Sequence, residues 1–359
     1  MTFQIPLRYT NGEIDRAGLK LKEGKVRTND YKEALSLLNN WRASHSYVMN
    51  TFVSTLHKKT ASFKNVIIAQ RLKRLPTILD KINRYPDMRL SRMQDIGGVR
   101  AILDNIGDVR KLEEDYLTKG RLPHELLRHD DYIVIPKDDG YRGVHLSYRY
   151  DNTLARNDLA KLHKGLKVEM QIRTHLQHSW STAVEAMGMF LGESFKTGSG
   201  DNEWREFFAL CSTAFAFAEK TPPCPQHEDI PIKEVYRRIR DLDNKLSARQ
   251  HIKDLTRAAF AINQHIRRRP IKRRLHYTII SLNLDKKEIA IWAFTRDQLN
   301  EANTKLVELE KRHGNFDQVL VSVSNLMSLK AAYPNYFLDM DEFTSRIDVI
   351  IEELNKTGI

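Results

Sequence analysis

Four short segments of the sequence combine basic, acidic and aromatic side chains of the types that a phosphoryl-transfer site uses. The first, QRLKRLPTILDKI, carries Arg71 and Lys73, and the second, SRMQDIGGVRAIL, carries Asp95 and Arg100. Cations of this kind can neutralise phosphate oxygens, and a carboxylate can hold a magnesium ion. A solvated basic helix or a lone surface aspartate would look the same, so neither segment is decisive by itself.

The third and fourth segments place further polar side chains on strand faces. PKDDGYRGVH has Lys137 in a turn, Gly140 where a positive φ is expected, and Tyr141 and His145 four residues apart on one face of a strand. Alternate residues of KVEMQIR are polar, namely Glu169, Gln171 and Arg173. A polar strand face can simply meet solvent, but beside the other three segments it indicates one shared site for nucleotide phosphates.

Hydrophobic periodicity predicts the elements that position these residues. Apolar residues recur at helical spacing from Asp30 to about Arg84, which puts Arg71, Lys73 and Arg74 in one turn of helix. The elements expected next are strand GGVRAIL, a helix over 108–117, strands DYIVIP, YRGVHLSYRY and KVEMQIR, and helices over 174–189 and 204–220. Helices packed against one mixed sheet make an α+β fold.

A second unit is expected after a break at TPPCPQ. A long charged helix over 232–268 leads to RRRPIKRR, where Pro270 marks a boundary. The pattern that follows is strand LHYTIISLNL, strand EIAIWAF, a helix over 297–312, strand QVLVSV, a helix over 326–332 and a final helix over 340–354. The predicted organisation is a main domain over 1–225, a helical linker over 226–270, and a small ββαβα domain with a C-terminal helix over 271–359.

Composition limits the class of partner and the compartment. The 359 residues include 58 Lys and Arg against 46 Asp and Glu, a net charge of +12 that favours polyanionic partners, although an inert basic surface would give the same figure. The two cysteines, Cys211 and Cys224, form neither a disulfide framework nor a four-ligand zinc pattern. No signal peptide and no apolar run of about 18 residues is present, so a cytoplasmic protein without a membrane partner is expected.

Together, the strings RxK, DxxGxR, PKxxGYxGxH and ExQxRT resemble the synthetase domain of the RelA/SpoT family over about residues 30–220. The resemblance implies a nucleotidyltransferase-like mixed sheet packed with helices, ATP as the pyrophosphate donor, and Mg²⁺ as the cofactor. Asp95 and Glu169 match the family's two metal-binding carboxylates. Glu169 also matches the group that activates the attacking hydroxyl, so the resemblance makes these two residues the catalytic pair.

The other motif positions fall into two sets. The ATP-binding set stacks on adenine or binds phosphates, and it comprises Arg71, Lys73, Arg100 and Lys137. The acceptor-binding set supplies an aromatic platform and its support, and it comprises Tyr141, His145, Gln171 and Arg173. The implied reaction transfers pyrophosphate from ATP to a 3′-hydroxyl, with AMP as the leaving group.

The resemblance leaves two acceptors open. THLQHSWSTAVE is similar to the corresponding string of the small toxic synthetases, some of which modify tRNA, and the turn has Gly143 where alarmone synthetases more often have serine. Both features favour the 3′-terminal adenosine of tRNA, which would block translation. The alternative acceptor is GDP or GTP, which would make the chain a (p)ppGpp synthetase.

The C-terminal unit resembles that of fused toxin–antitoxin synthetases of the CapRel type. There a zinc-finger-like domain without zinc ligands acts as the antitoxin, and a YxxY motif covers the adenine pocket; YPNYF supplies Tyr333 and Tyr336. The resemblance implies release by a phage protein such as the capsid, hence a role in antiviral defence. Two rival readings are a catalytically inactive RNA-binding module and a ribosome- or RNA-docking tail that binds through RRRPIKRR.

Overall fold

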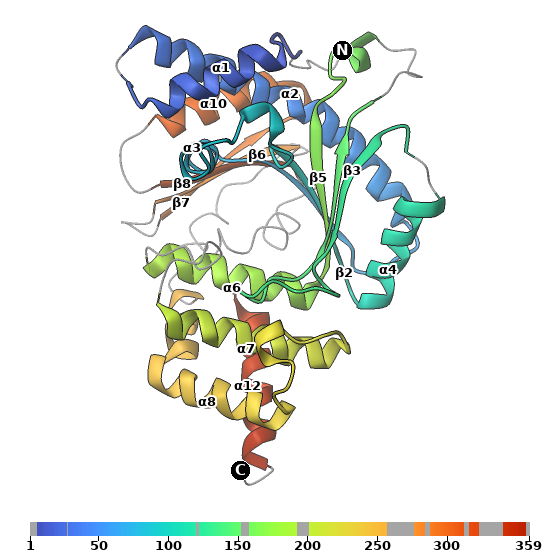
Figure 1. Ribbon diagram of the computed structural model, residues 1–359, viewed down its shortest axis with the longest axis vertical. Coiled ribbons are helices and arrows are strands. Elements are labelled where there is room, and N and C mark those ends of the chain that lie inside the picture. The colour runs from blue at the N-terminus through green and yellow to red at the C-terminus, as the bar shows by residue number, and fades with distance from the viewer. Residues whose placement is uncertain are drawn as a thin grey trace.

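The computed structural model describes residues 6–26, 28–119, 122–151, 158–191, 201–256, 276–283, 288–311, 316–322 and 340–356. These residues form one eight-stranded mixed sheet with the strand order β3-β4-β5-β2-β1-β8-β6-β7 (Figure 1). The strands are β1 Ile67–Leu72, β2 Gly97–Leu103, β3 Glu125–Asp131, β4 Val144–Arg149, β5 Lys167–Thr174, β6 Tyr277–Asn283, β7 Glu288–Phe294 and β8 Phe316–Ser322. The predicted α+β class with a mixed sheet is confirmed.

Helices lie on both sides of this sheet (Figure 1). The helices are α1 Asn11–Lys22, α2 Asn29–Lys59, α3 Leu75–Arg84, α4 Ile106–Glu114, α5 Asp158–Lys161, α6 His175–Leu191, α7 Asn202–Glu219, α8 Ile232–Leu246, α10 Leu299–Glu310 and α12 Asp341–Lys356. The long helix α2 crosses β1, β2 and β5, while α7, α8 and α12 form a separate helical layer next to α6. No helix among the described residues is long and apolar enough to cross a membrane.

Strand alternation separates a packed face of the sheet from a polar one. Val168, Met170 and Ile172 of β5 are fully buried in the core that α2 covers. Their neighbours Glu169 and Gln171 point to the opposite face, because successive side chains of a strand alternate. The polar alternation predicted for this segment is therefore confirmed, and the polar face is the one available to a ligand.

The helix predicted from Asp30 to Arg84 is wrong in its second half. Helix α2 ends at Lys59, and residues Ile67–Leu72 form strand β1, which pairs antiparallel with β2. Arg71 thus lies in a strand, while Lys73 and Arg74 form the link to α3. Short apolar runs fit either period, and here pairing with β2 decided in favour of the strand.

Two further predicted elements also change. DYIVIP is a turn, because the carboxylate of Asp131 accepts hydrogen bonds from the backbone N–H groups of Ile133 and Val134, and the strand lies before it as β3. The predicted helix over 232–268 is interrupted after Leu246, where Ser247 adopts a left-handed conformation with φ of 50°. Residues 248–256 are helical again, and residues 257–268 of the predicted helix lie outside the described residues.

The predicted C-terminal strands and helix are present as β6, β7, α10 and β8, but their strands continue the central sheet. Strand β8 pairs with β1, placing Val321 opposite Arg71, and β6 pairs with β8. Side chains of this unit, including Ile279 and Leu306, belong to the same core as α2. The predicted helix over 326–332 lies outside the described residues. The final helix, α12, packs instead against α6 and α8.

Candidate active site

Nine of the predicted site residues line one cavity of about 500 Å³ on the polar face of the sheet. They are Arg71, Asp95, Arg100, Lys137, Tyr141, His145, Glu169, Gln171 and Arg173. The strand pairings explain why they meet, because Gln171 lies opposite both His145 and Arg100 in the neighbouring strands. Four separate sequence segments are thus brought to one place by β1, β2, β4 and β5.

Asp95 sits between two lysines at the entrance to β2. Lys73 Nζ lies 2.6 Å from its Oδ2, and Lys81 Nζ lies 3.2 Å from its Oδ1. Burial acts to raise the pKa of Asp95, but the two lysines outweigh it and lower the pKa. Burial also lowers the pKa of Lys73, partly offset by Asp95. Lys73, the tenth of the predicted site residues, therefore reaches the site through its contact with Asp95.

Glu169 ends a chain of hydrogen bonds that crosses to strand β4. The Tyr141 hydroxyl lies 2.6 Å from His145 Nε2, and His145 Nδ1 lies 3.2 Å from Glu169 Oε1. Burial acts to raise the pKa of Glu169, but the hydrogen bond and charge of His145 lower it on balance. The carboxylate is therefore ionised at neutral pH, in the form that can accept a proton or bind a metal ion.

Gln171 fixes the second oxygen of that carboxylate. Its Nε2 donates to Glu169 Oε2 at 2.8 Å, and its Oε1 accepts from Arg100 Nε and Nη2 at 3.3 and 3.2 Å. These partners at both ends define which end of the amide is nitrogen. Gln171 thus connects a cation of the ATP-binding set to the proposed base.

Arg173 is the most enclosed cation of the site. Its side chain is buried, and its Nη2 lies 2.7 Å from His178 Nδ1. Burial, followed by the nearby charge of Arg100, lowers the pKa of Arg173 to about 9. An anion that enters the cavity would offset the free-energy cost of burying the Arg173 charge, because it would pair with that charge.

Aromatic rings form the other wall of the cavity. Tyr132, Tyr141 and His145 meet edge to face, with ring centroids 5.2–5.9 Å apart. Lys137 Nζ lies 4.4 Å from the centroid of Tyr132 and 5.2 Å from that of Tyr141. A flat base can stack on such a wall while the ammonium group meets its phosphates.

The turn that carries Tyr141 depends on Gly140. Its φ is +92°, as the sequence predicted in sign, and a Cβ added there would lie 2.9 Å from both Trp180 Cζ2 and Ser212 Cβ. Ser212 Oγ also donates to the Gly140 carbonyl at 2.6 Å. Packing against α6 and α7 therefore sets the position of the aromatic wall.

Several lining residues were missed from the sequence. They include Lys81, Arg92, Arg128, Asp130, Tyr132 and Ser181. Tyr132 was placed inside a predicted strand, and Lys81 was one cation among several in a predicted continuous helix. Nothing in the local sequence therefore marked either residue as part of the site. The predicted covering residues Tyr333 and Tyr336 lie outside the described residues.

The carboxylates fit a magnesium ion held jointly with a substrate. Asp95 and Glu169 line the same cavity, and the charge of Asp95 acts on the pKa of Glu169. Among the described residues, no group of three or more His, Cys, Asp or Glu side chains could enclose a metal ion. Mg²⁺ usually binds one or two protein carboxylates and completes its shell with water and phosphate oxygens.

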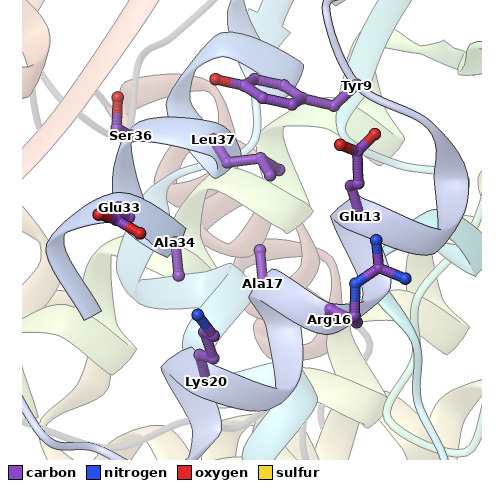
Figure 2. A pocket seen from close by; sticks show the side chains of 9 residues that line it. All are labelled: Tyr9, Glu13, Arg16, Ala17, Lys20, Glu33, Ala34, Ser36 and Leu37. Atoms are coloured by element: carbon purple, nitrogen blue, oxygen red, sulfur yellow. The ribbon is translucent and has the colours of Figure 1, made fainter. Parts of the chain in front are cut away.

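A second hollow of about 470 Å³ lies between α1 and α2 (Figure 2). It contains none of the predicted site residues, and its lining mixes acids and bases with apolar side chains such as Leu37. Its acid Glu13 already accepts a hydrogen bond of 2.8 Å from the Thr10 backbone, as part of the cap of α1. This hollow lacks the convergent cations and carboxylates of the larger site.

The central segment matches a known family. Residues 70–190 match the family model described as a region found in RelA/SpoT proteins, and this span holds all ten predicted residues of the catalytic pair and the two binding sets. This part of the chain is therefore similar to the corresponding region of RelA/SpoT proteins.

Curated relatives and solved structures show similarity over parts of the chain. GTP pyrophosphokinase YjbM of Bacillus subtilis is 30% identical over 122 residues, which cover 33% of this chain and 54% of that protein. Uncharacterized protein Rv1366 of Mycobacterium tuberculosis is 26% identical over 196 residues, covering 52% of this chain and 62% of that protein. The chain thus spans less than two thirds of either relative. Small alarmone synthetase 1 of Bacillus subtilis, solved with its product pppGpp, aligns with a TM-score of 0.41 and 22% identity over 53% of this chain and 94% of that one.

Proposed function

We propose that the chain is an ATP-dependent pyrophosphokinase, which transfers the β,γ-pyrophosphate of ATP to a ribose 3′-hydroxyl. The observation that carries this proposal is the ionised Glu169 in a cavity that Asp95 and several cations share. The RelA/SpoT-type match over residues 70–190 and the activity named for the YjbM relative support it. A purely binding module would not need a buried, oriented carboxylate in the same cavity as a second one.

The proposed reaction gives separate tasks to the chain's own groups. The acceptor oxygen forms a bond to the β-phosphorus of ATP, the bond from that phosphorus to the α,β-bridging oxygen breaks, and AMP leaves with the electron pair. Glu169 accepts the hydroxyl proton, while His145 and Gln171 hold its two oxygens in place. A magnesium ion bound by Asp95 and Glu169 would neutralise phosphate charge.

Lys73, Lys137 and the arginines of the ATP-binding set act on the phosphates and the adenine. Lys73 contacts Asp95 and Lys137 lies over the aromatic wall, so the two lysines bring positive charge to the phosphates from two separate segments of the chain. Their charge is best placed where negative charge develops during transfer. Tyr141 offers its ring to the acceptor base.

The proposed acceptor is the 3′-terminal adenosine of tRNA, whose modification blocks translation. The net charge of +12 supports a polyanionic substrate, and the stacking wall accepts any base. GDP or GTP is the alternative, favoured by the activity named for YjbM. Incubation with ATP labelled at its β- and γ-phosphates, tRNA and GTP together decides between them. Label on tRNA supports the proposal, and label on guanosine nucleotides alone refutes the tRNA assignment.

The proposed regulation is autoinhibition by the C-terminal domain, with Tyr333 and Tyr336 over the adenine pocket and a phage capsid protein as the releasing partner. Its support is the YPNYF string in a chain that carries a RelA/SpoT-type domain. Replacing both tyrosines with alanine should raise the transfer rate and slow host growth. Unchanged growth and rate in the variant would reject autoinhibition, and a capsid protein that leaves the wild-type rate unchanged would reject that trigger.

A further inference from the structure

The link between β1 and α3 is held from outside the RelA/SpoT-type region. Lys73, which contacts Asp95, and Arg74 make up this link. Its first carbonyl, that of Lys73, accepts a hydrogen bond of 3.1 Å from Arg42 Nε of α2. The N–H that follows the link, that of Leu75, donates to Glu310 Oε1 of α10 at 3.4 Å. The backbone groups on either side of Arg74 therefore depend on two side chains that are distant in sequence.

Those two side chains are partners of each other. Arg42 Nη1 lies 2.9 Å from Glu310 Oε2, and Arg42 Nη2 lies 2.9 Å from Glu310 Oε1. Their side chains are only 3% and 5% exposed. A two-pronged arginine–carboxylate contact of this kind fixes direction as well as distance. Because both charges are buried, loss of one partner leaves the other without compensation.

A second contact from the same C-terminal unit reaches the link. Arg74 forms an ion pair with Asp317 of β8, whose side chain is 6% exposed. Strand β8 also pairs with β1 and places Val321 beside Arg71. Figure 1 shows α10 beside α2 on the side of the sheet that carries α1. The C-terminal unit thus meets both β1 and the link that follows it.

We propose that Arg42 and Glu310 are positioning residues that set the place of Lys73 in the ATP-binding set. This inference rests on the proposed function. The Arg42–Glu310 pair holds the Lys73 carbonyl and the Leu75 N–H, the two backbone groups that flank Arg74 directly after Lys73, and Lys73 holds Asp95 in turn. The ATP-binding part of the site is therefore completed by residues of the C-terminal unit. Deleting this unit would remove support for Lys73 as well as the proposed autoinhibitory segment.

The test replaces both charges at once, with Arg42→Met and Glu310→Leu in the same chain. Paired apolar replacement of a buried ion pair is often neutral for stability, so this variant is expected to fold. Hydrogen bonds from charged groups contribute enough that their loss should raise the KM for ATP and the Kd for ATP with magnesium roughly ten- to a hundredfold. The KM for the acceptor should stay within about twofold, a split that a general loss of stability would not produce.

A matched control sits at the same junction. Tyr277 of β6 accepts a hydrogen bond of 3.0 Å from Asn50 Nδ2 of α2, but no hydrogen bond joins it to the Lys73–Arg74 link in the part of the chain that is described. Tyr277→Phe should leave the KM and the Kd for ATP within about twofold of wild type. Glu310→Asp serves as a second variant; it keeps the charge but shortens the reach to Leu75, and it should weaken ATP binding less than the double replacement does.

Each outcome separates this inference from the proposed function. The positioning role alone is overturned if the wild type is active and the folded double variant and Glu310→Asp have the same KM and Kd for ATP as the wild type. It is also overturned if Tyr277→Phe weakens ATP binding as much as the double replacement does. Absence of pyrophosphate transfer to tRNA or GTP in both the wild type and the Tyr333→Ala, Tyr336→Ala variant overturns the proposed function. In that case the Kd for ATP, measured by calorimetry, still decides whether Arg42 and Glu310 position the link.

Discussion

Replacing Glu169 with glutamine tests the role of the carboxylate with little change in shape. The amide oxygen can keep the hydrogen bond from Gln171 Nε2, and the amide nitrogen can donate to His145 Nδ1. His145 then carries its proton on Nε2 and donates it to the Tyr141 hydroxyl, so every member of the chain stays paired. The fold should therefore survive, with a change in unfolding free energy of about 1 kcal/mol or less.

The chemical loss should be far larger than the structural one. A positioned general base contributes about 10²–10⁴-fold to rate, which corresponds to roughly 3–5 kcal/mol of transition-state stabilisation. Glutamine cannot accept the hydroxyl proton, and a neutral amide is a weaker ligand for Mg²⁺. We expect kcat to fall by at least about 10²-fold, with the KM for ATP changing less than kcat because Lys73 and Lys137 remain.

The assay is the initial rate of pyrophosphate transfer from labelled ATP, alongside thermal unfolding of each variant. Glu125→Gln is the matched control, since Glu125 is a half-exposed glutamate of β3 that pairs with Arg149 at the surface. It should leave kcat unchanged, because exposed ion pairs contribute little. A folded Glu169→Gln enzyme that retains more than about a tenth of the wild-type rate would refute the assignment of the base.

Three further predictions concern stability. The pKa of Asp95 is lowered, so the stability that its contact with Lys73 contributes should be present above pH 3.8 and lost in acid below it. In unfolding experiments, Asp95→Asn should make the free energy of unfolding less dependent on pH in this acid range. Burial lowers the pKa of His227, but hydrogen bonds to the Cys224 thiol and the Glu206 carboxylate outweigh it and raise the pKa to about 9. The contribution of His227 to the free energy of unfolding should therefore be full below pH 6.5 and lost as the pH rises to about 9. Equal stability of His227→Gln and wild type below pH 6.5 would contradict this. Gly140→Ala should cost about 1–3 kcal/mol in denaturant titrations, because of its positive φ and the contact with Trp180, and a neutral result would contradict the packing described for the turn.

Local patterns were sufficient wherever one strand face is packed and the other is polar. The alternation around Glu169 predicted β5 with its correct faces, because period-two alternation is a property of the strand itself, and GGVRAIL was predicted as the strand that forms β2. Nine of the ten motif residues line one cavity in the structure. Where a short segment fitted two periods, as around Arg71, the local pattern failed, since the choice depended on a partner strand.

The sequence by itself determined the types of group in the predicted site: two carboxylates, a set of cations and a tyrosine. Only the tertiary structure decided how they are oriented, which neighbours they have, and that Lys81 and Tyr132 join them. It also brought Glu310 to Arg42 across 268 residues of chain, and joined β8 to β1. Contacts at such separations have no local period, because they arise from the packing of surfaces that the fold itself creates.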